Sequence, residues 1–69
     1  MYLFRKERVE EITKKFKIKQ LAKEIGIHEV QLSRIIHNKS KTSKPVAYIF
    51  TKIVDKDAEI NDYFIRKEK

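Results

Sequence analysis

The apolar positions of the chain recur with the period of an α-helix, in short runs separated by polar residues. In the first run, Val9, Ile12 and Phe16 share one face, and charged residues occupy the other. This pattern predicts a helix over residues 4–15. No segment alternates convincingly between apolar and polar residues with a period of two, so the predicted fold is all-α.

The next two runs are separated by Gly26, the single glycine of the chain. Residues 18–25 follow the i, i+3, i+4, i+7 pattern of a two-turn helix, and Leu32, Ile35 and Ile36 form the apolar stripe of a helix over 29–37. Glycine adopts left-handed backbone without a side-chain penalty, so Gly26 is predicted to end the first of these helices. Asn38 tolerates the same conformation and is predicted to end the second.

Two further helices are predicted after the polar, basic connection "NKSKTSKP". Pro45 suits the first turn of a helix, since the amide hydrogen that it lacks would be unpaired there. The core face of that helix is expected to carry four apolar residues: Val46, Ile49, Phe50 and Ile53. Beyond Asp55, the spacing of Ile60 and Phe64 predicts one more short helix, although "DYFIRK" is equally compatible with an edge strand.

The length of the chain and its lack of cysteine limit the number of domains and the size of the core. A chain of 69 residues without cysteine is one small domain, 1–69, and dimerisation would add stability that a small core lacks.

The net charge is +7, and residues 1–54 hold 13 Lys and Arg against 5 Asp and Glu. Such an excess attracts polyanions, most often nucleic acid and less often an anionic membrane, and the alternative is a solvated surface that keeps the chain soluble. The start lacks a secretion signal and the longest apolar run is too short for a membrane span, so the cytosol is expected.

The two helices around Gly26 have the outline of a helix-turn-helix over residues 18–37. Ala22 places a small side chain on the inner face of the first helix, where a bulky one would block the second. Gly26 follows four residues later, and Leu32 and Ile35 lie six and nine residues after it. Together, these residues and their spacing are more specific for a helix-turn-helix than the helical periodicity of the apolar residues alone.

The segments "QLAKEIGI....LSRIIHNKSK..SK" resemble the helix-turn-helix of the Cro/repressor (XRE-like) family of phage and bacterial regulators. Within that family, "FKI" and "IIH" resemble lambdoid Cro. The resemblance is specific over 16–44 and looser through 54. It implies a five-helix, lambda-repressor-like DNA-binding domain that binds an operator in double-stranded DNA as a homodimer. It also implies a bacterial or phage-infected cytoplasm as the location, in association with the nucleoid.

The resemblance further implies that helix 29–37 lies in the major groove, with its N-terminal half toward the base edges. Arg34 has the planar fork that pairs with guanine, and Gln31 can pair with adenine. Val30 can contact a thymine methyl group, and Ser33 can bond a base or a phosphate. Glu29 either stabilises the helix N-terminus or accepts a hydrogen bond from cytosine, and the first role is favoured.

Residues 17–44 carry 7 Lys and Arg against 2 Asp and Glu, and this excess of positive charge favours binding to DNA phosphates. The resemblance implies two places where the domain contacts the DNA backbone. One place is the start of helix 18–25, whose amide end also attracts anions. The other is the end of helix 29–37 and the loop after it. The predicted phosphate contacts are Lys17, Lys19, Gln20, His37, Asn38, Lys39, Lys41, Ser43 and Lys44. His28 departs from the family pattern, because it is a poorer N-cap than the usual Ser or Thr.

Other classes of function have less support. The chain has no glycine-rich phosphate loop, no nucleophile elbow and no HExxH, and two histidines without cysteine do not make a zinc site. We therefore expect no catalytic activity, metal, cofactor or small-molecule ligand. An RNA-binding domain would display aromatic residues, whereas Phe16, Phe50 and Phe64 fit a core.

Two questions stay open at this point. Tyr2, Tyr48 and Tyr63 are unassigned, and any of them can serve a dimer contact. The main alternative function is a helix-turn-helix module of the antitoxin or antirepressor type, which binds a protein and recognises no operator of its own. The exposed basic third helix argues against this alternative.

Overall fold

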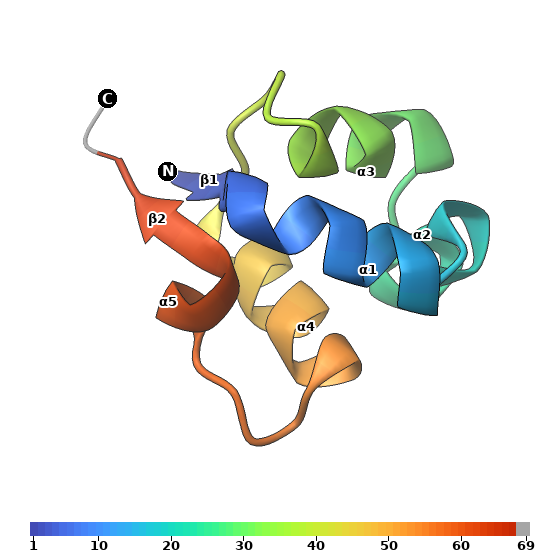
Figure 1. Ribbon diagram of the computed structural model, residues 1–69. Helices are drawn as coiled ribbons and strands as arrows, with labels where there is room; N and C mark the ends of the chain where they lie inside the picture. Colours follow the sequence, from blue (N-terminus) through green and yellow to red (C-terminus); the bar gives the residue numbers. More distant parts are fainter. Residues whose placement is uncertain (68–69) are drawn as a thin grey trace.

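The computed structural model describes residues 1–67, so the last two residues of the predicted 1–69 domain lie outside the described part. Five α-helices are packed around one core, and two short strands close one side of it (Figure 1). The helices are α1 (Val9–Lys15), α2 (Ile18–Ile25), α3 (Glu29–Ile36), α4 (Lys44–Val54) and α5 (Ile60–Tyr63). The predicted five-helix fold is confirmed, and the predicted ends of the helices around Gly26 agree closely with α2 and α3.

The N-terminal segment differs from the prediction. The helix expected from residue 4 is wrong: strand β1 (Tyr2–Phe4) and a 3₁₀ turn (Lys6–Arg8) precede α1. β1 pairs in antiparallel register with β2 (Phe64–Arg66), and Phe4 lies opposite Phe64. The segment "DYFIRK" therefore contains both the end of α5 and a strand. The strands form because each supplies backbone partners for the other across almost the full length of the chain, a constraint absent from local periodicity.

Four aromatic rings form the centre of the core at the junction of β1, α4, α5 and β2. The ring of Phe4 lies 5.4 Å from that of Phe50 and 5.2 Å from that of Phe64, both edge to face. Tyr63 adds a fourth ring 6.3 Å from Phe50. Since Tyr63 is only 5% exposed, it is excluded as a dimer contact, and burial raises the pKa of its hydroxyl. Phe16 is half-buried against the same core, so the three predicted core phenylalanines all pack inward.

Helix α4 is rotated from the expected orientation. Ala47, Phe50 and Thr51 are its buried residues, whereas Ile49 is 41% exposed and not a core residue as predicted. Apolar side chains occur on two adjacent faces of this helix, so the local pattern alone cannot select one. The face that carries Phe50 is the buried one, because the Phe50 ring packs against those of Phe4 and Phe64.

The turn at Gly26 joins α2 to α3 as the sequence predicts. Gly26 has a φ of 93°, in the left-handed region, and its amide donates to the carbonyl of Ala22 at 2.8 Å. The Ile27 amide donates to the same carbonyl at 3.0 Å, and the half-buried Ile27 side chain packs on the core. Asn38 has a φ of 67° after α3, which confirms the second predicted left-handed stop.

Gly26→Ala is expected to destabilise the fold by about 1 kcal/mol, because a Cβ is strained at this φ. No atom lies within 4 Å of the Cβ that would be added, so the cost is conformational and not a clash. Gly26→Asn, which tolerates left-handed backbone, is the matched control and should cost less. Urea denaturation followed by circular dichroism measures both. An alanine variant as stable as the parent chain would contradict this account of the turn.

Candidate nucleic-acid interface

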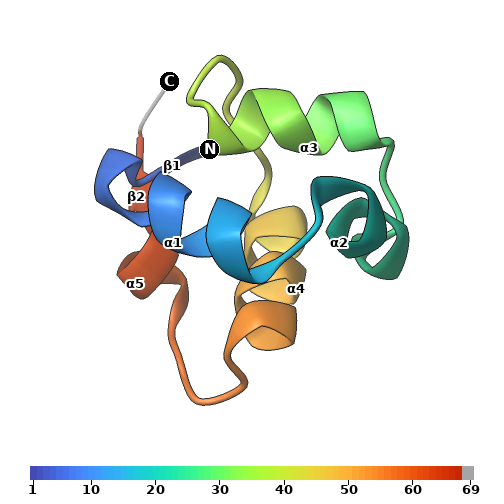
Figure 2. The ribbon, with the colours of Figure 1, turned by 45° about the vertical axis from the view of Figure 1, so that its right-hand side comes forward.

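Helix α3 has one face in the core and one face open to solvent. Leu32, Ile35 and Ile36 are buried beneath it. In two views α3 lies along one side of the molecule, and the α4–α5 connection lies on the opposite side (Figures 1 and 2). The core residues therefore hold α3 from behind, and its outer face is available to a partner.

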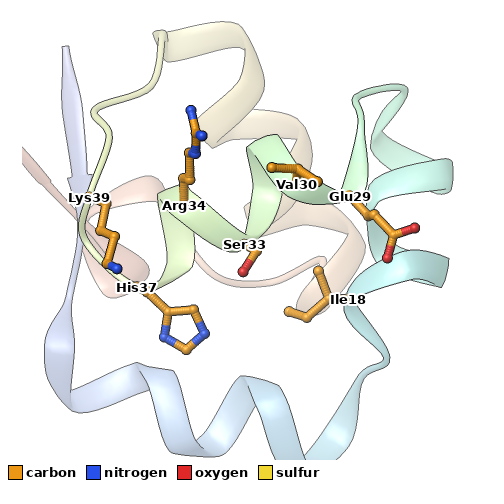
Figure 3. Close-up of a pocket in the computed structure, with 7 residues that line it drawn as sticks. All are labelled: Ile18, Glu29, Val30, Ser33, Arg34, His37 and Lys39. Atoms are coloured by element: carbon orange, nitrogen blue, oxygen red, sulfur yellow. The ribbon is translucent and has the colours of Figure 1, made fainter.

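A hollow of about 440 Å³ lies along this outer face, and we call it the α3 hollow (Figure 3). Its residues come from α3, from the start of α2 and from the loop after α3. They are Ile18, Glu29, Val30, Ser33, Arg34, His37 and Lys39. The hollow brings together helix-surface residues with residues from both predicted phosphate-binding segments.

Four of the five predicted base contacts line the α3 hollow. In Figure 3, Arg34 and His37 extend from opposite sides of α3, and Val30 lies on the outer surface. Val30 is 51% exposed, and Arg34 is exposed without an ion-pair partner among residues 1–67. Gln31, the fifth predicted contact, is exposed on α3 and does not line the hollow.

The side chain of His28 caps the N-terminus of α3 in place of a Ser or Thr. The Nδ1 atom of His28 accepts a hydrogen bond from the Val30 amide at 3.1 Å. This is the geometry of an N-cap, with an imidazole nitrogen in place of a hydroxyl oxygen. Because Nδ1 accepts, the proton of the neutral ring must lie on Nε2. His28 thus satisfies one of the first amides of the helix that carries Val30 and Arg34.

Glu29 lies in the first turn of α3, where a carboxylate is favoured by the helix dipole. Its side chain extends toward α2 in Figure 3, away from Arg34. Among the described residues it forms no ion pair. A free carboxylate here repels phosphate, so it weakens general attraction to DNA while it supports the helix.

Glu29→Gln is therefore expected to raise the affinity for random-sequence DNA about two- to threefold at low salt, because one repulsive charge is removed. It should lower the free energy of unfolding by about 0.3–1 kcal/mol. Electrophoretic mobility shifts and urea denaturation measure the two effects. The base preference should stay unchanged, and a preference lost at a single G·C pair would instead assign Glu29 to cytosine reading.

The start of α2 presents the first group of predicted phosphate contacts. Lys17 is the N-cap residue, and Lys17, Lys19 and Gln20 are all exposed. No side chain caps the first amides of α2 and its first turn holds no acid, so this helix end keeps its partial positive charge. Ile18 was missed as a site residue, because its place in the apolar pattern marks it as core. It is half-buried there and also lines the α3 hollow.

The loop after α3 carries the second group. Lys39, Lys41, Ser43 and Lys44 are exposed, and Ser43 starts α4 without a side-chain cap bond. The side-chain Nδ2 of Asn38, itself a predicted phosphate contact, donates to the carbonyl of Phe4 at 2.8 Å. The side chain thus tethers the loop to β1.

The same loop is joined to β1 at a second point. Tyr2 and Thr42 exchange backbone hydrogen bonds of 2.7 and 2.8 Å, and Thr42 is buried. Between the two tethers, at residues 38 and 42, the lysine side chains remain exposed. β1 therefore fixes the position of the basic loop relative to α3, although β1 itself contributes no predicted site residue.

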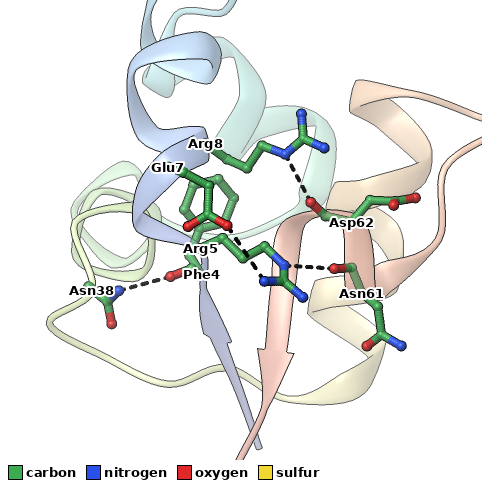
Figure 4. Close-up of polar contacts among 7 residues, drawn as sticks. All are labelled: Phe4, Arg5, Glu7, Arg8, Asn38, Asn61 and Asp62. Carbon is green, nitrogen blue, oxygen red and sulfur yellow. Dashed lines mark hydrogen bonds and ion pairs between the residues drawn. The ribbon is translucent and has the colours of Figure 1, made fainter.

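Two arginines hold the N-terminal segment against α5 (Figure 4). The Nε atom of Arg5 donates to the Asn61 carbonyl at 2.7 Å, and that of Arg8 donates to the Asp62 carbonyl at 3.0 Å. Arg8 also bonds Glu11 at 2.9 Å, which raises the pKa of the guanidinium. These contacts occupy Arg5 and Arg8, so the two arginines have a structural role distinct from that of Arg34.

Within residues 1–67, no three His, Cys, Asp or Glu side chains are grouped to hold a metal ion. None of the helices in that range has the length and apolar composition needed to cross a membrane. The exposed groups of the α3 hollow are those that recognise bases and phosphates.

Comparison with known proteins identifies the class. No curated protein and no solved structure matches the chain. The family model for the Cro/C1-type HTH DNA-binding domain matches residues 6–44, more than half of the chain. The match includes α1, the complete pair α2 and α3, and the basic loop up to the start of α4. The chain therefore belongs to the family of Cro/C1-type helix-turn-helix DNA-binding domains.

Proposed function

We propose that this protein is a sequence-specific transcriptional regulator, a Cro-like repressor that reads the major groove with α3. The observation that carries the proposal is the division of α3 into two faces. One face is buried, and the other presents Arg34, Ser33 and Val30 beside the start of α2 and the basic loop. A helix supported in this way can enter the groove while residues on both sides of it contact the backbone.

In this proposal Arg34 reads guanine through two parallel hydrogen bonds. Gln31 and Ser33 make further polar contacts to bases. The phosphate contacts are Lys17, Lys19, Gln20, His37, Lys39, Lys41, Ser43 and Lys44, with Asn38 positioning the loop. If each of the five lysines in this set neutralises one phosphate, log affinity should fall with log salt at a slope of about −4.5 per protomer.

We further propose that two copies bind one operator. Two-fold symmetric dimers place recognition helices about one helical turn of DNA apart, which predicts two half-sites at that spacing. Tyr48 is 51% exposed on α4 and is the most accessible of the three tyrosines, so it is the favoured dimer contact. Light scattering with and without the operator should show two protomers on one duplex, and one protomer per operator would contradict this part of the proposal.

Selection of bound duplexes from a random pool tests the proposed function. We expect an enriched motif with a guanine at a fixed position in each half-site. If no motif is enriched, sequence-specific regulation is wrong. A salt titration then separates the alternatives, because binding that is insensitive to salt would favour the protein-interaction module.

A further inference from the structure

We propose that His28 is a proton-sensitive positioning residue, which couples the order of the first turn of α3, and with it the recognition of the operator, to pH. The inference rests on the proposed function, because in that proposal the first turn of α3 presents Val30 and Gln31 to the DNA. It goes further by naming a condition, the protonation state of one imidazole ring, that regulates how well the operator is distinguished from other DNA.

The N-cap bond of α3 is the observation that carries the inference. Of helices α1 to α4, all within the described residues, only α3 begins with a hydrogen bond from one of its amides to a side chain. The Val30 amide donates to Nδ1 of His28 at 3.1 Å, and no other side chain in residues 1–67 bonds an amide of this turn. The helix has 8 residues, so its first turn is nearly half of its length. Loss of the bond leaves the Val30 amide without an acceptor in the protein, which destabilises this turn.

The cap bond exists only while the ring of His28 is neutral. A neutral imidazole has one nitrogen that accepts and one that donates, whereas the protonated ring has two donors and no acceptor. Protonation therefore places an N–H group of the ring opposite the N–H group of Val30, and it adds a positive charge at the positive end of the helix dipole. Histidine ordinarily takes up a proton as the pH falls from about 8 to about 5, so the cap is present above this range and is lost as the pH falls through it.

His28 is exposed in the turn between α2 and α3, so a proton reaches the ring without any structural change. Among the described residues, no ion pair joins His28 to the charged side chains of either helix. These side chains are Lys19, Lys23 and Glu24 on α2 and Glu29 and Arg34 on α3. Glu29, which follows His28 in the sequence, extends toward α2 (Figure 3). The cap bond to Val30 is therefore the contact of the ring that its protonation removes.

General attraction to DNA and recognition of the operator respond differently to this proton. One more positive charge increases the attraction to phosphates on any sequence. Recognition of bases requires an ordered first turn of α3, and the affinity for the operator falls in proportion to the fraction of molecules in which this turn is ordered. The ratio of the affinities for operator and for random DNA isolates the second effect, because the added charge acts on both complexes. We expect this ratio to fall about three- to tenfold between about pH 7.5 and about pH 5.5, in line with the usual contribution of an N-cap.

Binding to the selected operator and to random duplexes at the two pH values tests the inference. His28→Ser keeps an oxygen acceptor at the N-cap at every pH, so its affinity ratio should not change with pH. His28→Ala has no acceptor, so its ratio should be low at both pH values. His37→Gln is the matched control, because it removes the other histidine, which is exposed at the end of α3. In this variant the fall in the ratio should persist, while the increase in affinity for random DNA at low pH should become smaller.

Urea denaturation gives a second readout that needs no DNA. The unfolding midpoint of the parent chain should fall relative to that of His28→Ser as the pH is lowered. If this difference appears but no operator motif is enriched, the proposed function is wrong and the proton-sensitive cap stands. If a motif is enriched and the parent chain and His28→Ser give the same ratio at both pH values, His28 does not couple α3 to pH and our inference is wrong.

Discussion

Arg34→Ala is expected to abolish the preference for guanine at one position of each half-site, with a loss of roughly 5- to 150-fold in affinity for the operator. The magnitude follows from the 1–3 kcal/mol of discrimination that a bidentate arginine–guanine pair provides. Arg34 is exposed, lines the α3 hollow and has no ion-pair partner among the described residues, so no ion pair needs to break before it binds. Its truncation should leave stability almost unchanged.

Binding to matched and single-mismatch duplexes measures this effect. The control is Lys41→Ala, which removes an exposed cation from the basic loop. It should weaken binding to every sequence by a similar factor and reduce the magnitude of the salt slope by about one. If Arg34→Ala behaves like Lys41→Ala, with a uniform loss and an unchanged motif, Arg34 is a phosphate contact and does not read bases.

Phe50→Ala is expected to lower the free energy of unfolding by about 3–5 kcal/mol, the usual cost of removing a buried aromatic ring. Phe50 is 1% exposed, and its ring lies against three others, those of Phe4, Phe64 and Tyr63. A domain of this length typically has a stability of about 3–10 kcal/mol, so the variant should be largely unfolded or close to unfolding.

Thermal and urea denaturation followed by far-ultraviolet circular dichroism measure the loss. Tyr48→Ala is the control on the same helix, and it should change the unfolding free energy by less than about 1 kcal/mol because Tyr48 is half exposed. A cooperative transition for Phe50→Ala at the same midpoint as the parent chain would show that the aromatic cluster does not determine stability.

Much of the helical framework can be predicted from sequence because its signals are local. The apolar stripe of α3, the glycine after α2 and the proline in the first turn of α4 each act within a few residues of the feature they specify. The same holds for the outward direction of Arg34 and Val30, which follows from helical geometry once Leu32 and Ile36 face inward.

Other features of the site depend on contacts between distant segments. Asn38 has the backbone conformation expected of a helix stop, but its side chain bonds a carbonyl of β1 that no local pattern associates with it. Ile18 occupies an apolar position that predicts burial, and only the approach of α3 leaves part of it in the hollow. His28 is a weak cap by residue type, yet its ring nitrogen lies within hydrogen-bond distance of the Val30 amide.

The sequence by itself determined the helix-turn-helix, its basic charge and the residues on the outer face of α3, because periodicity and turn chemistry operate over short distances. Only the tertiary structure decided that residues 2–4 form a strand, that Phe50 and not Ile49 faces the core, and that β1 tethers the basic loop. The physical reason is the same in each case. Backbone pairing and ring packing depend on partners that the chain brings together only when it folds, such as β2, Thr42 and Phe64.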